Sequence, residues 1–209
     1  IEDFISITDL NCSYNYLTSL NLGQNNSLDY LECNFNQLTA LDISQNSALA
    51  TLQCDHNLLT SIDVSQNVFL SNLDCGYNPL INLDVSQNTS LASLASQNQY
   101  VNGQLNSGSG LLTGLDLSQN TALEYLSCGG NQLTSLDISQ NVSLWHLDCG
   151  YNQITSLDVS QNSALVLLQC AYNQITNLDV SQNTALERLS FEANQISSLD
   201  LSQNNNLIR

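Results

Sequence analysis

A six-residue motif, LDVSQN, recurs along this chain at a nearly constant spacing. It stands unchanged at 83–88, 157–162 and 178–183, and copies with one conservative change occupy 41–46, 62–67, 115–120, 136–141 and 199–204. A degenerate copy, LNLGQN, begins at residue 20. Successive copies follow a 21-residue period, as from 20 to 41 and from 41 to 62, except for a 32-residue step from 83 to 115. A fixed period of this length is the signature of a solenoid, in which each repeat is one winding stacked on the next.

These spacings set the expected domain organisation. We predict a single solenoid over residues 1–209, built from about nine 21-residue windings. The long step exceeds the period by 11 residues (32 − 21), which predicts an insertion near 97–110. That segment is rich in Gly, Ser and Asn and therefore suits a loop. Solenoids need polar end caps and neither end of the sequence carries one, so we expect the natural chain to be longer.

A second motif, LxxLxCxxNxL, fills the other half of each winding. In the second winding it reads Leu28-x-x-Leu31-x-Cys33-x-x-Asn36-x-Leu38. We call this the variable half and LxxLDVSQN the fixed half. Ser96 and Phe191 stand at the cysteine position of two windings. The other windings have cysteine there, and this accounts for all seven cysteines: Cys12, Cys33, Cys54, Cys75, Cys128, Cys149 and Cys170.

Both halves are versions of LxxLxLxxNxL, and on these residues the chain resembles leucine-rich repeat proteins. The resemblance covers essentially the whole chain and is strongest to the 21-residue, cysteine-bearing repeats of internalin J-like bacterial surface proteins. It implies a repeat solenoid with a parallel β-sheet on the concave face, short extended or β segments on the opposite side, and little or no helix. For function it implies adhesion or recognition by a secreted or surface-anchored protein, although this scaffold serves many uses.

The order of residues within each half predicts which side chains point inward. In Leu-x-Cys and Leu-Asp-Val the first and third side chains share one face, so the leucine, cysteine and valine columns should form the core. Stacked windings should pair as parallel strands about 4.8 Å apart. The asparagine of each half, such as Asn36 and Asn46, should turn inward at a bend and hydrogen-bond backbone groups that the bend leaves unpaired.

The cysteine column favours structural thiols over reactive ones. A single column at 21-residue spacing does not surround a metal ion. Neighbouring windings bring cysteine Cα atoms within bridging distance, but the count is odd and stacked side chains run parallel, so we expect free buried thiols. The two histidines, His56 and His146, belong to no nucleophile motif. A solenoid also makes an open groove more readily than a closed site, and we therefore predict no enzymatic activity.

The charge of the chain restricts its partners. The sequence carries 19 Asp and Glu against 2 Lys and Arg, a formal net charge of −17 at pH 7. This balance argues against nucleic acid and anionic membranes as direct partners. No apolar run is long enough to cross a bilayer, so membrane insertion is not expected. With the resemblance, the expected location is extracellular or at the cell surface. Uncapped apolar ends also predict end-to-end self-association.

One column of acids needs a compensating interaction. Two exposed carboxylates about 5 Å apart repel by roughly 1 kcal/mol in water, and the repulsion opposes stacking. Hydrogen bonds from neighbouring hydroxyls, such as those of Ser44 and Ser65, would offset it. Calcium is the alternative, although a flat column supplies few of the six to eight oxygens that calcium binds. We expect hydrogen bonds and screening, and no cofactor. The column consists of Asp42, Asp63, Asp84, Asp116, Asp137, Asp158, Asp179 and Asp200.

Function should lie where the windings differ, and the outward positions of the variable half differ most. Aromatic residues follow the cysteine column or precede the second leucine, and acids stand between leucine and cysteine. Such side chains suit recognition of a protein or a glycan; the alternative is that the aromatic column packs on itself and shields the turn. The predicted ligand-binding residues are Tyr30, Phe35, His56, Tyr77, Tyr125, Trp145, His146, Tyr151, Tyr172, Glu32, Asp74 and Asp148.

Together these observations favour a non-catalytic binding module that recognises a protein or glycan ligand on the variable concave face. Two alternatives stay open. One is a structural spacer that holds other domains away from a cell wall and has no ligand. The other is a glycan-binding accessory region of a carbohydrate-active enzyme. The repeat itself is architectural in all three cases, so the sequence does not identify the ligand.

Overall fold

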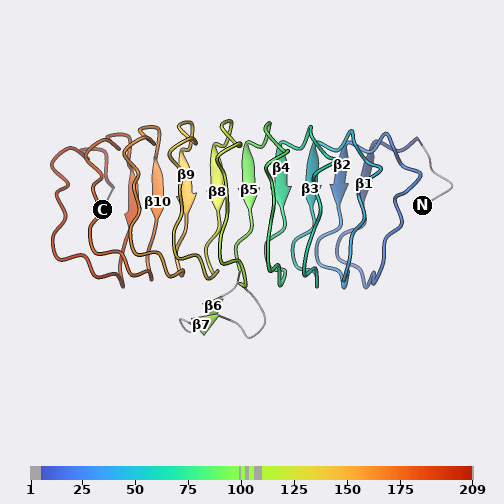
Figure 1. Cartoon of the computed structure of the whole chain (residues 1–209), viewed down its shortest axis with the longest axis horizontal. Coiled ribbons are helices and arrows are strands. Elements are labelled where there is room, and N and C mark those ends of the chain that lie inside the picture. Colours follow the sequence, from blue (N-terminus) through green and yellow to red (C-terminus); the bar gives the residue numbers. More distant parts are fainter. Residues whose placement is uncertain (1–5, 99, 102–103, 106–109, 209) are drawn as a thin grey trace.

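The computed structural model describes residues 6–98, 100–101, 104–105 and 110–208, and these form one elongated β-solenoid (Figure 1). Nine parallel strands make a continuous sheet along its length, in the order β1-β2-β3-β4-β5-β8-β9-β10-β11. Each strand has three residues: β1 (Asp9–Asn11), β2 (Tyr30–Glu32), β3 (Thr51–Gln53), β4 (Asn72–Asp74), β5 (Ser93–Ala95), β8 (Tyr125–Ser127), β9 (His146–Asp148), β10 (Leu167–Gln169) and β11 (Arg188–Ser190).

The register of the sheet follows the period of the sequence. Leu31 of β2 pairs with Leu52 of β3, which lies one period further along the chain. Leu94 of β5 pairs with Leu126 of β8, and this pair spans the long step in the repeat. The additional residues therefore leave the sheet without shifting its register.

The residues between β5 and β8 carry a second, two-stranded sheet. Its antiparallel strands are β6 (Tyr100–Val101) and β7 (Gln104–Leu105). Figure 1 shows them beyond the edge of the solenoid, on the side where the strands end. Residues 99, 102–103 and 106–109 of the predicted insertion lie outside the described residues.

The fixed half runs along the opposite side of the solenoid, in extended and turn conformations. The Asn46 N–H donates to the Ile43 carbonyl (3.0 Å), and the Leu49 N–H donates to the Asn46 carbonyl (3.0 Å). None of the described residues of this half forms a strand, and no described residue is helical, so no described helix could cross a bilayer. These features confirm the predicted fold class, a repeat solenoid with a parallel sheet and little or no helix.

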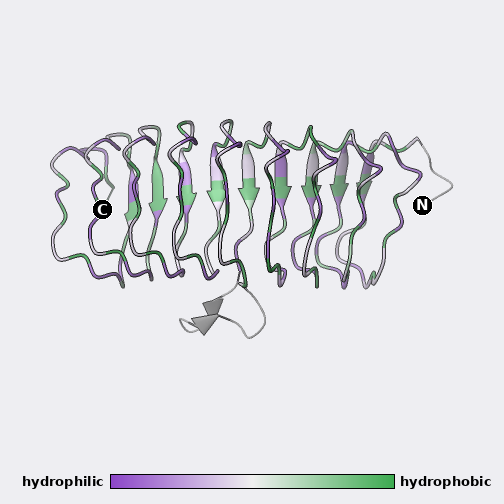
Figure 2. Ribbon diagram, viewed as in Figure 1, coloured by the Kyte–Doolittle hydropathy of each residue, from purple (hydrophilic) through white to green (hydrophobic). Residues whose placement is uncertain are grey.

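The inward columns form one continuous core. Leu31, Cys33 and Leu38 of a single winding are fully buried, and the equivalent residues of the next windings pack against them. Figure 2 shows hydrophobic and hydrophilic residues alternating around each winding. All seven cysteines are free, as predicted, and six of them are buried. Burial raises the pKa of the Cys54 thiol well above its usual range, so this thiol is protonated at neutral pH and behaves as a small apolar side chain.

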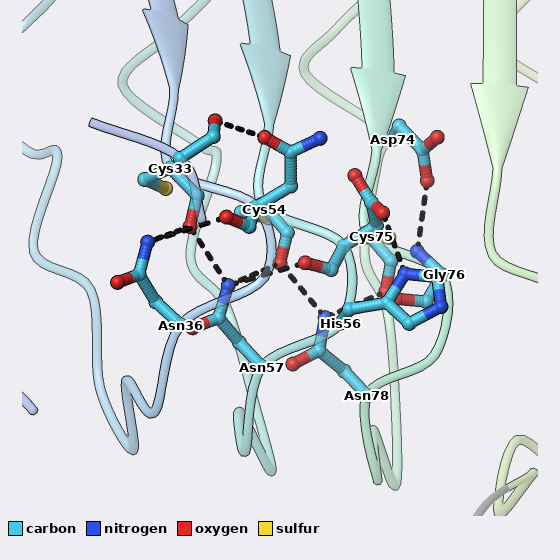
Figure 3. Close-up of polar contacts among 12 residues, drawn as sticks. Cys33, Asn36, Cys54, His56, Asn57, Asp74, Cys75, Gly76 and Asn78 are labelled. Atoms are coloured by element: carbon cyan, nitrogen blue, oxygen red, sulfur yellow. Dashed lines mark hydrogen bonds and ion pairs between the residues drawn. The ribbon is translucent and has the colours of Figure 1, made fainter. Parts of the chain in front are cut away.

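An asparagine ladder joins successive windings in the variable half. The Asn57 Nδ2 group donates to the carbonyls of Cys33 (3.0 Å), Cys54 (3.1 Å) and Asp55 (3.2 Å). Its Oδ1 accepts the buried N–H of Leu38 (3.0 Å). Figure 3 shows asparagines of three neighbouring windings in this arrangement. The predicted role of asparagine is confirmed: one amide satisfies backbone groups of its own bend and of the preceding winding.

The asparagines of the fixed half are less completely satisfied. The Asn67 Nδ2 group donates to the carbonyls of Ile43 (3.2 Å) and Asn46 (2.8 Å). Its buried Oδ1 has no partner among the described residues. The same holds for Oδ1 of the equivalent residues Asn46, Asn88, Asn120, Asn141, Asn162, Asn183 and Asn204. Both halves therefore use asparagine at a bend, but the ladder of the variable half makes more hydrogen bonds.

This difference predicts unequal costs for removing the two kinds of asparagine. Asn57→Ala leaves a buried N–H and buried carbonyls unpaired and should lower the free energy of unfolding by about 2 to 4 kcal/mol. Asn67→Ala in the next fixed half should cost about 1 to 2 kcal/mol, because it also removes an acceptor that has no partner in the described structure. Urea unfolding followed by circular dichroism measures both. Equal losses would contradict the hydrogen-bond assignment.

Ser96 is the irregular member of the cysteine column. It is 1% exposed, and its hydroxyl oxygen is buried without a hydrogen-bond partner in the part of the chain that the structure describes. A buried hydroxyl that has no partner costs free energy, whereas a thiol at the same position does not. The winding that precedes the insertion is therefore less stable than its neighbours at this position.

Reciprocal exchanges test this account. Ser96→Cys should raise the free energy of unfolding by about 1 kcal/mol, because it replaces an unpaired hydroxyl with a thiol. Cys54→Ser, the matched reverse exchange in a regular winding, should lower it by about 1 to 2 kcal/mol. Thermal and urea unfolding under reducing conditions give both values. A less stable Ser96→Cys protein would show that the serine hydroxyl is satisfied.

Candidate functional site

The variable positions of successive windings gather on two adjoining surfaces. The first is the outward side of the strands, made by the first and third residue of each, which we call the sheet face. The second is the row of turns after the strands, which we call the aromatic rim. Because the strands lie side by side (Figure 1), residues far apart in sequence share each surface. The aromatic rim consists of Tyr14, Phe35, His56, Tyr77, Tyr151 and Tyr172.

The rings of the aromatic rim stack on one another. The stacked pairs are nearly parallel, with interplanar angles from 7° to 26°. The self-packing that the sequence left as an alternative is therefore present. It leaves outer ring surface accessible, since Tyr172 is 41% exposed. Ring centroids are 4.5 Å apart for Tyr14–Phe35, 4.0 Å for Phe35–His56, 4.1 Å for His56–Tyr77 and 4.2 Å for Tyr151–Tyr172.

Every residue of the aromatic rim has a left-handed backbone conformation. The φ angles lie between 51° and 56°, and Gly130, at the same place in its winding, has φ of 72°. This conformation costs a residue with a side chain about 1 to 2 kcal/mol, whereas glycine adopts it freely. Stacking returns about 0.5 to 1.5 kcal/mol per pair. Glycine would suit these turns at least as well, so the persistence of aromatic side chains there marks the rim as a functional candidate.

A second aromatic group lies at the start of β8 and β9, where Trp145 directly precedes β9 and borders the sheet face. Tyr125 of β8 stacks on His146 of β9 with centroids 4.3 Å apart, and Trp145 meets the His146 ring edge-on at 5.5 Å. Trp145 is 44% exposed. Burial lowers the pKa of His146, and the neighbouring Asp148 only partly opposes this effect. At pH 7 the group is therefore a largely neutral aromatic surface.

Glu32 and Tyr30 of β2 are engaged with each other. The Tyr30 hydroxyl and the Asn11 amide both donate to the Glu32 carboxylate. The hydrogen bond to Glu32 and partial burial raise the pKa of Tyr30. Tyr30 is thereby held as a protonated, oriented ring at this end of the sheet face.

Asp74 of β4 has an unusual environment (Figure 3). Burial, and then the Asp55 carboxylate, raise its pKa to about 6, although the Gly76 N–H (3.1 Å) and His56 favour the charged form. Asp55 is buried, and its Oδ2 lies 2.7 Å from Nδ1 of His56. Burial also raises the pKa of Asp148, the equivalent carboxylate of β9. Two carboxylates of the sheet face are thus partly desolvated, which costs stability in the ionised form.

A groove of about 420 Å³ runs across β2, β3, β4, β5 and β8 on the sheet face. Tyr30 and Tyr125 line its two ends, and Asp74 lies between them. Gln97, which follows β5, also lines the groove and accepts the Tyr77 N–H at its carbonyl (2.8 Å). A Cβ atom at residue 76 would lie 3.0 Å from that carbonyl oxygen, so a side chain there would be crowded against Gln97.

Sequence reasoning missed the small residues of this groove. Within the column of Tyr30 and Tyr125 the intervening strands carry much smaller side chains, and this size contrast along one column was the available signal. The missed residues are Thr51, Gln53, Asn72, Ser93 and Gln97.

The predicted ligand-binding residues therefore divide into three sets. Tyr30, Asp74 and Tyr125 line the groove, and Glu32 accepts a hydrogen bond from Tyr30. Trp145, His146 and Asp148 lie beside Tyr125 or on the neighbouring strand β9. Phe35, His56, Tyr77, Tyr151 and Tyr172 belong to the aromatic rim. These sets spread along most of the described solenoid and do not form one pocket.

The aspartate column of the fixed half is held by serine. Asp42 Oδ1 accepts the Ser44 N–H (3.0 Å) and the Ser44 hydroxyl (2.7 Å), and these hydrogen bonds lower the pKa of Asp42. Asp63 and Ser65 repeat the arrangement. In the part of the chain that the structure describes, no group of three or more His, Cys, Asp or Glu residues is placed to hold a metal ion. Hydrogen bonding from serine is therefore the stabilising interaction observed in this column.

Two substitutions at one rim position separate strain from stacking. Tyr172→Ala loses the stack on Tyr151 but keeps a left-handed residue with a side chain, so it should lower the free energy of unfolding by about 1 kcal/mol. Tyr172→Gly loses the same stack and relieves the strain, so it should be more stable than Tyr172→Ala by about 1 kcal/mol. Urea unfolding of both proteins gives the difference. A glycine protein less stable than the alanine protein would contradict the strain assignment.

Asp74→Asn should raise the free energy of unfolding at pH 8. The folded-state pKa of Asp74 is about 6 and its ordinary value is 3.8. Protonated Asp74 therefore stabilises the fold, fully below the ordinary value, and this contribution is lost as the pH rises through the folded pKa. With solvent screening, the gain on substitution should be about 1 to 2 kcal/mol above pH 7 and should shrink toward zero near pH 4.

Urea unfolding at several pH values between 4 and 8 measures this profile. Asp63→Asn is the matched control, because Asp63 is exposed and its pKa is lowered by Ser65. It should show no such gain at high pH. The same profile in both proteins would mean that net charge, and not the burial of Asp74, is responsible.

Several solved structures share the architecture of this chain. No protein-family model matches the chain, and no curated protein sequence matches it. Among solved structures, the functional domain of InlJ from Listeria monocytogenes, described as including a cysteine ladder, is 34% identical with a TM-score of 0.70. That match covers 99% of this chain and 53% of the other, so the chain spans about half the length of this relative.

Two further structures share the fold at lower identity. The internalin InlF from Listeria monocytogenes is 22% identical with a TM-score of 0.88, over 99% of this chain and 61% of the other. The leucine-rich repeat ectodomain of the Arabidopsis thaliana receptor kinase GASSHO1/SCHENGEN3, solved in complex with Casparian strip integrity factor 2, is 20% identical with a TM-score of 0.61 over 89% of this chain and 27% of the other. The 21-residue windings, the free cysteine column and the likeness to InlJ show that the chain has the leucine-rich repeat fold with a cysteine ladder.

Proposed function

We propose that this chain is a non-catalytic module that binds a protein ligand through the sheet face and the aromatic rim. The observation that carries the proposal is the separation of constant from variable positions. The fixed half repeats with conservative changes, whereas the positions that differ gather on two adjoining surfaces. A scaffold that only stacked would have no reason to concentrate its variation there.

The chemistry of these surfaces suits protein recognition. Trp145 and Tyr172 are large, rigid side chains that remain more than a third exposed. Tyrosine and tryptophan are enriched among the residues that dominate protein interfaces, because they supply contact area at low entropic cost. Stacking fixes the rings before a ligand arrives, which lowers the entropy lost on binding.

Analogy with the neighbours supports a protein ligand. The plant ectodomain with this fold was solved with a bound factor, and InlJ shares the cysteine ladder. A shared fold supports a protein ligand but does not identify the partner. We extend the proposal to adhesion or recognition by a secreted or surface-attached bacterial protein. A catalytic role has little support, because the buried thiols are protonated and the groove is open.

The test is a binding screen followed by matched substitutions. The immobilised protein is screened against an array of extracellular-matrix and cell-surface proteins and, in parallel, against a glycan array. A triple variant, Trp145→Ala with Tyr151→Gly and Tyr172→Gly, removes three of the rings of these surfaces while glycine preserves the turns. It should bind the selected protein at least about tenfold more weakly. Ile81→Ala is the control, because Ile81 is exposed but lies outside both surfaces.

The outcomes distinguish the alternatives. Loss of binding in the triple variant, with retained circular dichroism and with binding intact in Ile81→Ala, supports the proposal. Binding to glycans alone would favour a glycan-binding accessory region. No ligand on either array would favour a structural spacer and overturn the proposal. A partner that the triple variant binds unchanged would overturn the assignment of binding to these rings.

A further inference from the structure

The groove on the sheet face has the dimensions of a site for one extended segment. Its ends are Tyr30 of β2 and Tyr125 of β8, with three strands between them. At about 4.8 Å per strand, the two rings stand roughly 19 Å apart. Between them the same column carries Thr51, Asn72 and Ser93, which are too small to fill the space. The result is a trough of about 420 Å³ with an aromatic ring at each end.

The floor of the trough presents acceptors without matching donors. Asp74 lies half-buried at its centre, and the one hydrogen bond that its carboxylate accepts from described residues comes from the Gly76 N–H. Gln97 also lines the trough, and its side-chain oxygen is buried without a hydrogen-bond partner in the described structure. A buried acceptor without a donor is costly in the free protein, and a ligand that donates hydrogen bonds would remove that cost.

The acidic surroundings of the trough favour a cationic ligand that donates hydrogen bonds. Asp55 lies close enough to Asp74 to raise its pKa, and within the described residues Arg188 of β11 is the only Lys or Arg. That strand lies three positions beyond β8 in the sheet. The chain as a whole carries a net charge of −17. An anionic ligand would meet repulsion here, whereas a cation would meet a carboxylate with no described Lys or Arg beside it.

We infer that this groove receives a lysine or arginine side chain from an extended segment of the protein partner. The guanidinium or ammonium group sits over Asp74 and donates to the carboxylate and to the Gln97 side-chain oxygen. The flanking parts of the segment extend toward Tyr30 and Tyr125 at the two ends of the groove. A charge-assisted hydrogen bond in a partly desolvated site is stronger than one at an open surface. The inference rests on the proposed function, since it names the chemistry by which one part of the sheet face recognises its ligand.

The test uses defined probes and needs no knowledge of the natural partner. The protein is labelled with ¹⁵N and titrated with a pentapeptide in which arginine is flanked by glycines, blocked at both ends. The matched probe has citrulline, which is neutral and has nearly the same shape, in place of arginine. A third probe is a neutral trisaccharide. Chemical-shift changes at the backbone amides of 51–53, 72–74 and 93–95 report occupancy of the groove.

The arginine peptide should shift these amides with a dissociation constant on the order of 1 mM, as one charged side chain can provide. The citrulline peptide should bind at least about tenfold more weakly. Asp74→Asn should abolish the preference for arginine, and this variant is expected to fold because it removes a destabilising charge. Asp63→Asn removes the same charge from the opposite side of the solenoid and should leave binding unchanged.

Three results would overturn the inference. They are equal shifts with arginine and citrulline, a preference for arginine that persists in Asp74→Asn, and a trisaccharide that shifts the groove amides more strongly than arginine does. The last result would assign the groove to a glycan. This experiment leaves Trp145, Tyr151 and Tyr172 intact, so its failure is distinguishable from failure of the proposed protein-binding function, which those three residues test.

Discussion

The asparagine amides at the bends are the interaction on which the rest of this structure depends. A chain that turns every few residues would bury many unpaired carbonyls and N–H groups if nothing at the turn bonded them. Asn57 satisfies groups in its own winding and in the preceding one, and the equivalent asparagines repeat this along the solenoid. Each winding is therefore held at a fixed distance and register from the last. The parallel sheet and the leucine and cysteine columns follow from that register.

The same register determines what the functional surfaces can be. Side chains at equivalent positions stand one strand spacing apart, which is close to the separation at which aromatic rings stack. Aromatic residues at the same turn position of successive windings therefore stack on one another, as from Tyr14 to Tyr77. The left-handed turns and the partly desolvated Asp74 lower stability, and both lie on the surfaces where the windings vary. The repeated residues therefore stabilise the fold, whereas some of the variable residues lower its stability.

The repeat made most of the fold predictable from sequence. The repeat period predicted the solenoid, and the alternation of residues predicted the inward columns. The inward position of the asparagines followed from the need to hydrogen-bond the backbone groups at the bends. The candidate site was harder to predict from the sequence. That Tyr30, Tyr125 and Asp74 would share one face could be predicted from register. The groove was missed, because its one signal is the smaller side chains on three intervening strands and no motif marks them. The left-handed turns were missed because residues such as Tyr172 do not favour that conformation, and only Gly130 in the same column signals it.

The positions that break the repeat rule are themselves clustered. In the winding that precedes the insertion, Ser96 replaces cysteine, Gln97 stands where a neighbouring winding has Gly76, and Asn98 replaces an aromatic residue. Each carries a buried side-chain oxygen that has no partner among the residues the structure describes. Gln97 lines the groove, and the insertion follows directly after this segment. Most other windings have cysteine at the first of these places, whereas residues as different as Asn34, Gly76 and Ala171 occupy the second. Three adjacent polar side chains with unpaired buried oxygens lower stability, and they are what selection for a ligand in the adjoining groove would leave.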